Sequence, residues 1–412
     1  MYESLIPMTK RIVSLSLLCL IEIQMQDVQG SKYGTFWSNR SKNGKLFKNL
    51  TSTKPFTFSF SRLVKYIFRR SRRESKNALR ERYAKFRQVW NQQCNAAEVL
   101  KRLRQDPSKS LMDHVFWIGH STILLCLHTG TNILFDPIFS KRCSPFRLVG
   151  PARRCPPGTT LAHLPPIHIV ALSHNHYDHL DTESVKAIYK QHPNVTFVVP
   201  RRMDTHLTSW GIPYASIITM DWQDEIRLKG VAIGCTPAQH YGRRGLWDGN
   251  RVLWCGWCIG WQPTNLADSS SPVTMEDGTV GFVRRSAAVR PSLQVIDWSS
   301  AKVFYYAGDT AFNTSLFDLI HAQYNHVDMA AIPIGAYKPR WFMSTHHIDP
   351  ASAVKIFKIL NVKKAFGVHW ATFELADDTL DEPPKELKTA LDLENVSKQD
   401  FVLIPIGGHL SF

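Results

Sequence analysis

The feature that most constrains this chain is a group of four imidazole and carboxylate side chains within six residues. His174, His176, Asp178 and His179 form an H-x-H-x-D-H pattern directly after the apolar run 167–172, which has the character of a buried strand. A loop after a strand can aim the first two histidines at one metal ion, and Asp178 with His179 at a second. Imidazole and carboxylate are ligands of catalytic zinc sites, whereas closed structural sites favour cysteine. The pattern therefore predicts a catalytic metal site, with a solvated polar loop as the alternative.

Three further polar residues complete a two-metal set. Each follows an apolar run typical of a strand: His240 after 231–236, Asp309 after 303–306, and His369 after 365–368. Side chains at the ends of separate strands can converge on one rim. Taken singly, each of these residues is more often a turn or cap residue, so their weight comes from completing the set.

Length and charge narrow the classes of protein. The chain has 412 residues, of which 44% are hydrophobic, enough for one large α/β domain or two smaller ones. Fifty Lys and Arg against 34 Asp and Glu give a formal charge of +16, which favours an anionic partner such as a nucleic acid or an acidic membrane face. Cys255 and Cys258 form a C-x-x-C inside an apolar run, so we expect them in the core rather than in a redox or zinc pair.

The first 60 residues lie outside the expected catalytic domain. Residues 1–30 join a basic flank to an apolar stretch shorter than the roughly 20 residues that span a bilayer. This segment has the character of a signal peptide, an interfacial anchor or a gene-model extension, so secretory entry through it stays open. The polar stretch 31–60 is predicted to be disordered.

Residues 61–111 form a strongly basic segment with interleaved apolar residues. Between 61 and 105 the pattern predicts a helical extension that lies on an anionic membrane surface, where each basic residue contributes about 1 kcal/mol. The alternatives are a solvated helix packed on the folded domain and a nucleic-acid-binding arm. The catalytic domain is expected at 112–412.

The rest of the chain alternates strand and helix patterns. Asp181 and Asp349 are predicted helix caps, and the proline after Asp349 suits a first turn. The patterns predict helices at 182–191, 201–210, 350–360 and 383–393, and strands at 195–199 and 401–404.

Six further motifs accompany the metal cluster: WIGHST at 117–122, FDPIFS at 135–140, TPAQH at 236–240, IPIGAY at 332–337, PRWFM at 339–343 and HWATF at 369–373. Together they resemble the metallo-β-lactamase superfamily and, within it, the N-acyl-phosphatidylethanolamine-hydrolysing phospholipase D family. The cluster is common to the whole superfamily, whereas the stretch around 336–343 is similar to the lipid hydrolases in particular. The resemblance covers roughly 112–412 with one interruption.

The resemblance implies an αββα sandwich, an α/β fold in which two β-sheets pack face to face between helices. It also implies two zinc ions per chain at one edge of the sandwich. The first zinc would be held by His174, His176 and His240, the second by Asp178, His179 and His369, with Asp309 bridging. A hydroxide held between the metals would attack a phosphodiester phosphorus, and Asp178 and Asp309 would be the catalytic carboxylates.

Outer residues are expected to orient the ligands, because metal-bound imidazoles usually donate their other N–H to a carboxylate or carbonyl. We assign this role to His120, Asp136 and Asp181. The alternatives are a turn at Asp136 and a helix cap at Asp181. His347 resembles the family position near the substrate phosphate, which it would orient, or whose leaving alkoxide it would protonate.

The substrate implied by the resemblance is a membrane phospholipid, N-acyl-phosphatidylethanolamine, cleaved by water to phosphatidate and N-acylethanolamine. Tyr177, Trp341 and Phe342 are the candidates for lining an acyl-chain groove. The resemblance also implies a homodimer that associates peripherally with intracellular membranes of the Golgi or endosome.

Residues 263–300 depart from the family pattern, which joins the flanking strands by a short turn. This polar insertion adds little loop-closure cost, because that cost grows slowly with length. Since it precedes Asp309, a disturbed strand here would put the bridging ligand in doubt.

Two other functions compete with the lipid hydrolase. A metallo-β-lactamase-fold nuclease acting on RNA would suit the +16 charge, but we find no RNA-clamping arm and do not expect nucleic acid as the partner. A non-catalytic membrane-binding protein would not need seven intact ligands in four separate segments. Binding of RNA should weaken steeply with salt, which separates it from binding in an apolar lipid groove.

Overall fold

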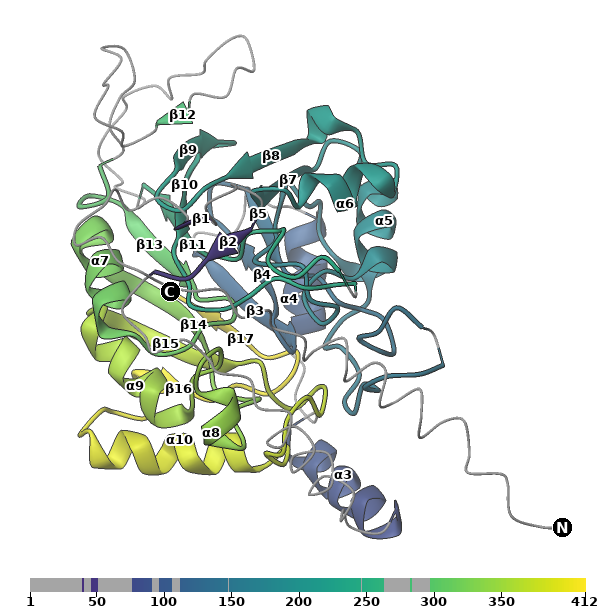
Figure 1. Ribbon diagram of the computed structural model, residues 1–412, viewed down its shortest axis with the longest axis vertical. Helices are drawn as coiled ribbons and strands as arrows, with labels where there is room; N and C mark the ends of the chain where they lie inside the picture. Colours follow the sequence, from purple (N-terminus) through teal and green to yellow (C-terminus); the bar gives the residue numbers. More distant parts are fainter. Residues whose placement is uncertain are drawn as a thin grey trace, which may run out of the picture.

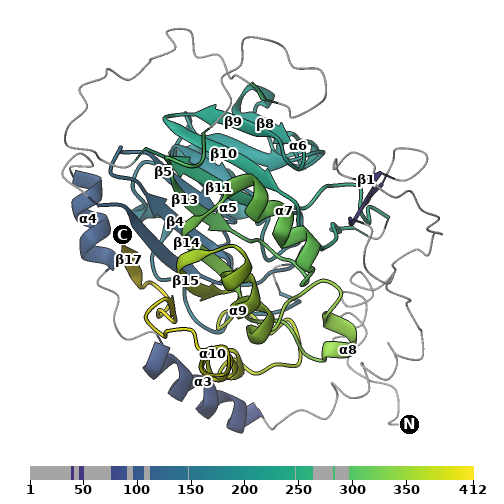
Figure 2. The same ribbon diagram turned by 90° about the vertical axis from the view of Figure 1, so that its left-hand side faces the viewer.

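Two β-sheets pack face to face between two outer layers of helices, as the computed structural model shows (Figure 1). The architecture is the expected αββα sandwich, seen from a second side in Figure 2. The structure describes residues 39–40, 46–50, 76–90, 96–105, 112–146, 148–245, 247–262, 282–283 and 297–412.

Within these residues the first sheet has seven strands in the order β17-β3-β4-β5-β6-β7-β8. Strands β5 to β8 run parallel, and β17, β3, β4 and β5 pair antiparallel. The bounds are β3 His114–Gly119, β4 Thr122–Cys126, β5 Asn132–Phe135, β6 Ile169–Ala171, β7 Thr196–Pro200, β8 Ile217–Met220 and β17 His409–Ser411.

The second sheet has eight strands in the order β12-β9-β10-β11-β13-β14-β15-β16. Strands β13 to β16 run parallel, and the remaining pairs are antiparallel. The bounds are β9 Glu225–Leu228, β10 Val231–Thr236, β11 Gly256–Trp261, β12 Phe282–Val283, β13 Lys302–Tyr306, β14 Val327–Pro333, β15 Val362–Val368 and β16 Phe401–Val402. A separate pair joins β1 Asn39–Arg40 to β2 Phe47–Lys48.

Helices cover the outer faces of both sheets (Figure 1). The bounds are α3 Lys76–Trp90, α4 Ala96–Gln105, α5 Thr182–Gln191, α6 Asp204–Ser209, α7 Thr314–Tyr324, α8 Arg340–Met343, α9 Pro350–Ile359 and α10 Glu382–Leu393, with 3₁₀ turns at Leu161–His163 and Tyr214–Ser216. Among the described residues, no helix has both the length and the apolar character needed to cross a membrane.

Alternating burial explains why the first sheet lies between two layers. In β3, Val115 and Trp117 point into the core between the sheets, and Phe116 and Ile118 pack under the helices on the other face. Successive side chains of a strand point to opposite faces, so a run that is apolar at every position suits a sheet covered on both sides.

The parallel strands carry the functional residues to one edge. Asp136 follows β5, the metal-ligand loop follows β6, Asp309 follows β13 and His369 follows β15. The carboxyl ends of parallel strands meet at the same edge of a sheet, and the face-to-face packing brings the two edges together. The chain makes a tight bend before Asp309 at Gly308, which has a φ of +60° and whose added Cβ would lie 2.7 Å from a backbone oxygen.

Most predicted elements appear near their expected bounds. Asp349 caps α9 by accepting from the Ser352 amide at 2.8 Å. The helix predicted at 201–210 is wrong at its start, because Arg202 has a φ of +67° and α6 begins only at Asp204. The strand predicted at 401–404 is shorter than expected, because β16 ends at Val402, and the strand β17 that follows it was not predicted.

The insertion leaves its flanking strands paired. Strands β11 and β13 are antiparallel neighbours in register from Trp257–Tyr306 to Trp261–Lys302, so Asp309 follows an undisturbed strand. The expectations for residues 1–30 and for most of 31–60 and 263–300 fall outside the described residues. Cys255 and Cys258 are buried and unpaired, as expected of core residues.

The basic segment contains two described helices, α3 and α4. The buried face of α3 packs on the domain: Phe86 and Trp90 contact the ring of Trp370 edge-on, with ring centroids 6.1 and 4.9 Å apart. Tyr83 hydrogen-bonds Glu374, which also pairs with Arg154. This is the packed helix that we considered as an alternative, and it leaves only the outer face of α3 for other contacts.

Candidate metal centre

Three imidazole nitrogens converge on one point at the edge of the sandwich. His174 Nε2 lies 2.9 Å from His176 Nδ1, and His240 Nε2 lies 3.2 Å from the same atom. Asp309 Oδ2 lies 3.7 Å from both His174 Nε2 and His240 Nε2. We call these four residues the first set.

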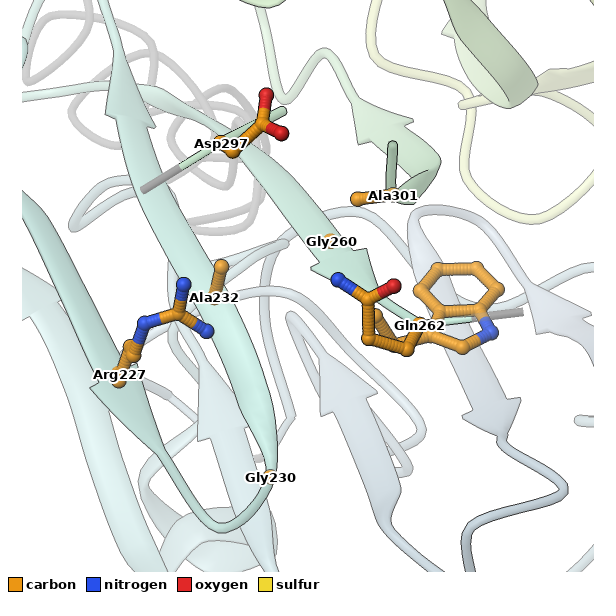
Figure 3. Close-up of a pocket in the computed structure, with 8 residues that line it drawn as sticks. Arg227, Gly230, Ala232, Gly260, Gln262, Asp297 and Ala301 are labelled. Carbon is orange, nitrogen blue, oxygen red and sulfur yellow. The ribbon is translucent and has the colours of Figure 1, made fainter. Parts of the chain in front are cut away.

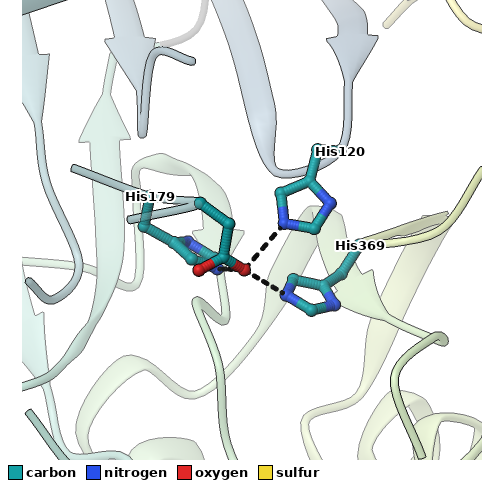
Figure 4. Close-up of side chains that lie close together, drawn as sticks. His120, His179 and His369 are labelled. Carbon is teal, nitrogen blue, oxygen red and sulfur yellow. Dashed lines mark hydrogen bonds and ion pairs between the residues drawn. The ribbon is translucent and has the colours of Figure 1, made fainter. Parts of the chain in front are cut away.

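A second group of donors lies beside the first. Asp178 Oδ2 is 3.4 Å from the Nε2 atoms of both His179 and His369 and 3.0 Å from His120 Nε2 (Figure 4). We call Asp178, His179, His369 and His120 the second set. His120 was expected only as an outer residue, and the structure instead brings its Nε2 within 4.8 Å of the donor atoms of the other three.

Asp309 links the two sets. Its Oδ2 lies 3.2 Å from His179 Nε2 and its Oδ1 lies 3.2 Å from His369 Nε2, in addition to its contacts in the first set. The structure therefore brings all seven predicted ligands together, with Asp309 in the bridging place.

The donor set suits metal binding. His179 Nε2, His369 Nε2 and Asp309 Oδ1 are buried and make no hydrogen bond of standard geometry, although they lie 3.2 Å from other donor atoms of the cluster. An unpaired buried polar atom costs about 1–3 kcal/mol, and a divalent ion at these atoms would offset that cost. Imidazole and carboxylate with no thiolate among the donors are typical of catalytic rather than structural sites.

Burial and neighbouring charges shift the pKa values of the cluster histidines in two opposite directions. Burial lowers the pKa of His240 to about 3 and that of His176 to about 4, so both imidazoles are neutral at pH 7 with a lone pair available. Burial also lowers the pKa of His369, but the carboxylates of Asp309 and Asp178 outweigh it and raise the value to about 9. The same carboxylates raise the pKa of His179 above its ordinary value.

Asp136 fixes one of the ligands. Its buried Oδ2 lies 2.6 Å from His179 Nδ1, which must be the protonated nitrogen, so Nε2 faces the cluster. Asp136 also accepts from the Ser173 amide at 2.7 Å and from the Tyr306 hydroxyl at 2.7 Å. The expected outer role of Asp136 thus has a geometric basis. In the first set, the His346 carbonyl lies 2.8 Å from His240 Nδ1 and accepts its N–H, so that Nε2 of His240 faces the cluster.

Asp181 does not contact an imidazole. Its carboxylate accepts from the Ser140 amide and hydroxyl at 3.2 and 2.9 Å and from the Ser184 hydroxyl. It precedes α5 as the cap residue, although its side chain makes no cap hydrogen bond. Asp181 therefore ties the loop after β5 to α5, and the expectation that it orients a metal ligand is wrong.

The backbone is strained where it presents these groups. His120, Asp136 and His369 have φ values of +54°, +37° and +63°. Positive φ costs a non-glycine residue about 1–2 kcal/mol, and such strain persists where the surrounding contacts hold it in place. At His369 those contacts include its amide, which donates to the His120 carbonyl at 3.0 Å.

His347 lies at the margin of the cluster, with Nδ1 3.9 Å from Asp309 Oδ2. Phe342 reaches it through His346: the Phe342 and His346 ring centroids are 5.8 Å apart, and the two imidazoles are 5.1 Å apart. Trp341, beside Phe342 on α8, is 42% exposed. Phe342 is therefore separated from His347 by the His346 ring, and Trp341 packs on Phe342 with ring centroids 5.7 Å apart.

Tyr177 has a different environment from the one expected of a groove residue. Its ring lies under the Arg244 guanidinium at 4.0 Å, and its hydroxyl donates to the Arg244 carbonyl at 3.0 Å. Sequence reasoning missed Arg244. The only indication in the sequence was that Arg244 lies four residues after the predicted ligand His240, between Arg243 and Gly245.

A separate hollow lies at the opposite ends of β9, β10 and β11 from His240 (Figure 3). Its labelled lining residues include Arg227 and Asp297, and it contains no histidine. It is therefore distinct from the metal centre.

Comparison with families and relatives agrees with this geometry. The family model described as the beta-lactamase superfamily domain matches residues 131–267 and 261–370. The N-acyl-phosphatidylethanolamine-hydrolyzing phospholipase D 1 of Caenorhabditis elegans is 33% identical over 71% of this chain and 73% of its own length. The mitochondrial enzyme of the same description from Saccharomyces cerevisiae is 28% identical over 66% of this chain and 50% of its own length.

Solved structures share the fold. The isothiocyanate hydrolase from Delia radicum gut bacteria aligns over 73% of this chain and 99% of its own, with a TM-score of 0.50 and 15% identity. A possible metal-dependent hydrolase from Veillonella parvula aligns over 73% of this chain and 100% of its own, with a TM-score of 0.50 and 14% identity.

Proposed function

Because the chain belongs to the metallo-β-lactamase superfamily, and within it to the N-acyl-phosphatidylethanolamine-hydrolysing phospholipase D family, we propose that it hydrolyses N-acyl-phosphatidylethanolamine to phosphatidate and N-acylethanolamine. The broader assignment, that the protein is a metal-dependent hydrolase, rests on the fold and the family. The observation that carries the proposal is the pair of histidine and aspartate sets linked by Asp309.

We propose two zinc ions as the cofactors, the first on His174, His176 and His240 and the second on Asp178, His179 and His369, with Asp309 between them. When bound, two such metals supply an activated water and neutralise the phosphate. Asp178 and Asp309 serve this role as charged ligands: despite burial, which raises their pKa, the neighbouring histidines hold the pKa of both carboxyls well below the ordinary range.

His347 is proposed to orient the phosphate. Burial lowers its pKa well below the ordinary value, so the side chain is a neutral imidazole that donates one N–H. This favours orientation over protonation of the leaving alkoxide, the other role considered for this residue. We expect His347→Gln to keep the full metal content and to lose about 100-fold in turnover, the lower end of what a positioned proton-handling or orienting group contributes. Measuring metal per chain beside turnover would check this, and loss of metal would instead make His347 a ligand.

The apolar part of the substrate is proposed to lie along α8. Phe342 contacts His346, the neighbour of His347, and Trp341 packs on Phe342 and is partly exposed. An N-acyl chain or a lipid tail next to the phosphate would meet these rings first. Tyr177, held under Arg244, is a less suitable lining residue than we expected, because its hydroxyl and ring face are already in contact.

We further propose that the protein works at an anionic membrane surface. Lys85 and Arg87 on α3 and Lys101 and Arg102 on α4 are exposed basic residues that such a surface could contact, although Arg102 also pairs with Glu98 and Arg87 also donates to the Arg154 carbonyl. The homodimer and the Golgi or endosomal location stay predictions of the family resemblance. Sedimentation with vesicles that contain phosphatidylserine, compared with neutral vesicles, would test the membrane contact.

Product analysis by mass spectrometry tests the reaction. The purified chain, with its metal content measured, meets N-acyl-phosphatidylethanolamine in mixed micelles with and without a chelator. Plain phosphatidylethanolamine and a short RNA are tested in parallel as alternative substrates. We expect chelator-sensitive release of phosphatidate and N-acylethanolamine from the N-acyl lipid only.

Two results would contradict the proposal. If a metal-loaded chain released no N-acylethanolamine, N-acyl-phosphatidylethanolamine would be ruled out as the substrate, while the classification as a metal-dependent hydrolase would stand. Cleavage of RNA in preference to the lipid would show that the protein is a nuclease. His347→Gln is the matched control, since it should hold metal like the parent and release little product.

A further inference from the structure

One arginine connects the two loops that carry the first set. Arg244 lies four residues after His240, and its guanidinium reaches the loop that carries the other ligands. Nη1 donates to the carbonyl oxygens of Asn175 at 3.2 Å and Leu180 at 2.7 Å, and Nη2 donates to Thr182 Oγ1 at 3.1 Å.

These contacts bracket the ligand loop. Asn175 and Leu180 lie on either side of His176, Asp178 and His179 in the sequence. Inside this bracket, the amides of His179 and Leu180 both donate to the His176 carbonyl, at 3.1 and 2.8 Å. The guanidinium thus holds the two ends of a single turn whose side chains point to the metal centre. A planar fork with several fixed donors can span two carbonyls at once, which a lysine ammonium on a flexible stem cannot do in the same geometry.

The arginine is itself held in place. Its guanidinium carbon lies 4.0 Å from the Tyr177 ring centroid and 5.2 Å from that of Trp210. The Tyr177 hydroxyl returns a hydrogen bond to the Arg244 carbonyl at 3.0 Å, so the two loops hold each other from both sides. Asp248 accepts from the Arg244 and Gly245 amides, at 3.1 and 2.7 Å, and closes the loop that follows His240.

We propose that Arg244 is a positioning residue for the metal centre, which sets the place of His240 relative to His174 and His176 and so the affinity of the first metal position. It makes no contact with the ligand nitrogens and acts through the backbone of the loop. Two of the three histidines of the first set belong to the β6 loop and the third to the β10 loop, so nothing in either loop alone fixes their separation. The inference rests on the metal centre of the proposed function and is independent of its substrate.

The test compares Arg244→Ala and Arg244→Lys with the parent chain. Metal affinity is measured by competition with a chromophoric chelator, and ligand geometry by the visible absorption of the Co²⁺-loaded protein. We expect Arg244→Ala to lose about 10- to 100-fold in affinity at one metal position, the range for groups that orient metal ligands, and to shift the Co²⁺ bands. Arg244→Lys should fall between the parent and the alanine variant.

Two controls separate positioning from general stability. Arg201→Lys changes another arginine, which pairs with Asp221 at 2.8 Å and has no contact in the bracket, and should leave metal affinity unchanged. Tyr177→Phe removes only the returned hydrogen bond and should cost less than Arg244→Ala. Should Arg244→Ala fail to fold, Arg244→Lys carries the comparison.

Parental metal affinity and an unchanged Co²⁺ spectrum in both Arg244 variants would overturn the proposal, even where thermal unfolding shows a loss of stability. A failed lipid hydrolysis would leave the proposal standing, because the metal measurements use no substrate. An equal loss of metal affinity in Arg201→Lys would also contradict the proposal, because the loss would then follow from replacing an arginine outside the ligand loops.

Discussion

The two sets of the metal centre use the same kinds of ligand in different surroundings. In the first set, imidazoles contact neutral groups: the His346 carbonyl at His240 and the Ser173 hydroxyl at His174. In the second set, imidazoles contact carboxylates: Asp136 and Asp178 lie against His179, and Asp178 and Asp309 against His369.

The difference changes the state in which each imidazole meets a metal ion. Burial lowers the pKa of the first-set histidines and outweighs the Asp309 carboxylate, so each ring is neutral at pH 7 and one of its two nitrogens carries no proton. In the second set the carboxylates outweigh burial and raise the pKa of His179 and His369, so a metal ion must displace protons there. The residue type predicts a ligand, but the neighbours decide how readily it binds.

The largest effect is expected at the residue that the two sets share. Asp309→Asn removes a charge that faces His179 and His369 and also lies near the first set. Outer groups that only orient ligands cost about 10–100-fold, so loss of this shared carboxylate should reduce turnover more than about 100-fold and lower the metal content of both positions. Turnover and metal per chain are measured together, with surface Asp392→Asn as the control. Full activity with two bound metals would show that Asp309 bridges nothing.

The sequence indicated that the seven ligands could meet because they come soon after apolar strand runs, whereas the sandwich and the division of the ligands between two metals were implied by the family resemblance. Such runs set both the strand and its end, and parallel strand ends share one edge. His120 was assigned an outer role only, because it lies in the turn between β3 and β4, outside the ligand pattern. Arg244 was missed because its function depends on contacts between two loops, which no local pattern reports. Asp181 was misassigned because an N-cap position and an outer carboxylate look alike in sequence.

Asp136→Asn should affect the second set alone. The amide can no longer accept with the strength of a carboxylate at His179 Nδ1, so the ring loses the partner that aims Nε2 at the cluster. We expect about 10- to 100-fold weaker binding at one metal position and parental affinity at the other. Chelator competition that resolves two affinities makes the measurement. Equal weakening at both positions would contradict the expectation and show that Asp136 also acts on the first set, through Ser173 and its contact with His174.

His120→Gln distinguishes a ligand from a holder of Asp178. The Gln amide can still donate toward Asp178 Oδ2, which His120 Nε2 contacts at 3.0 Å. If the imidazole only holds the carboxylate, metal affinity at the second set should fall by about 10-fold, the lower end for orienting groups. Complete loss of one metal would show that His120 is itself a ligand, and metal per chain measured after dialysis decides between the two.

Proton release gives the smallest signal and the most direct view of the two surroundings. At pH 7 the first-set histidines are already neutral, with one unprotonated nitrogen each, whereas His369, with its pKa of about 9, and His179, with its raised pKa, must lose a proton before Nε2 can bind a metal ion. Calorimetric titration with Zn²⁺ in buffers of different ionisation enthalpy should therefore report little proton release for the first equivalent and about one to two protons for the second. The sign fixes the pH dependence: as pH falls from about 9 towards 7, protons compete at the second set while first-set binding stays constant until the pH approaches the pKa of about 4 at His176. Equal release by both equivalents would mean that the carboxylates of the second set do not control the protonation of its histidines.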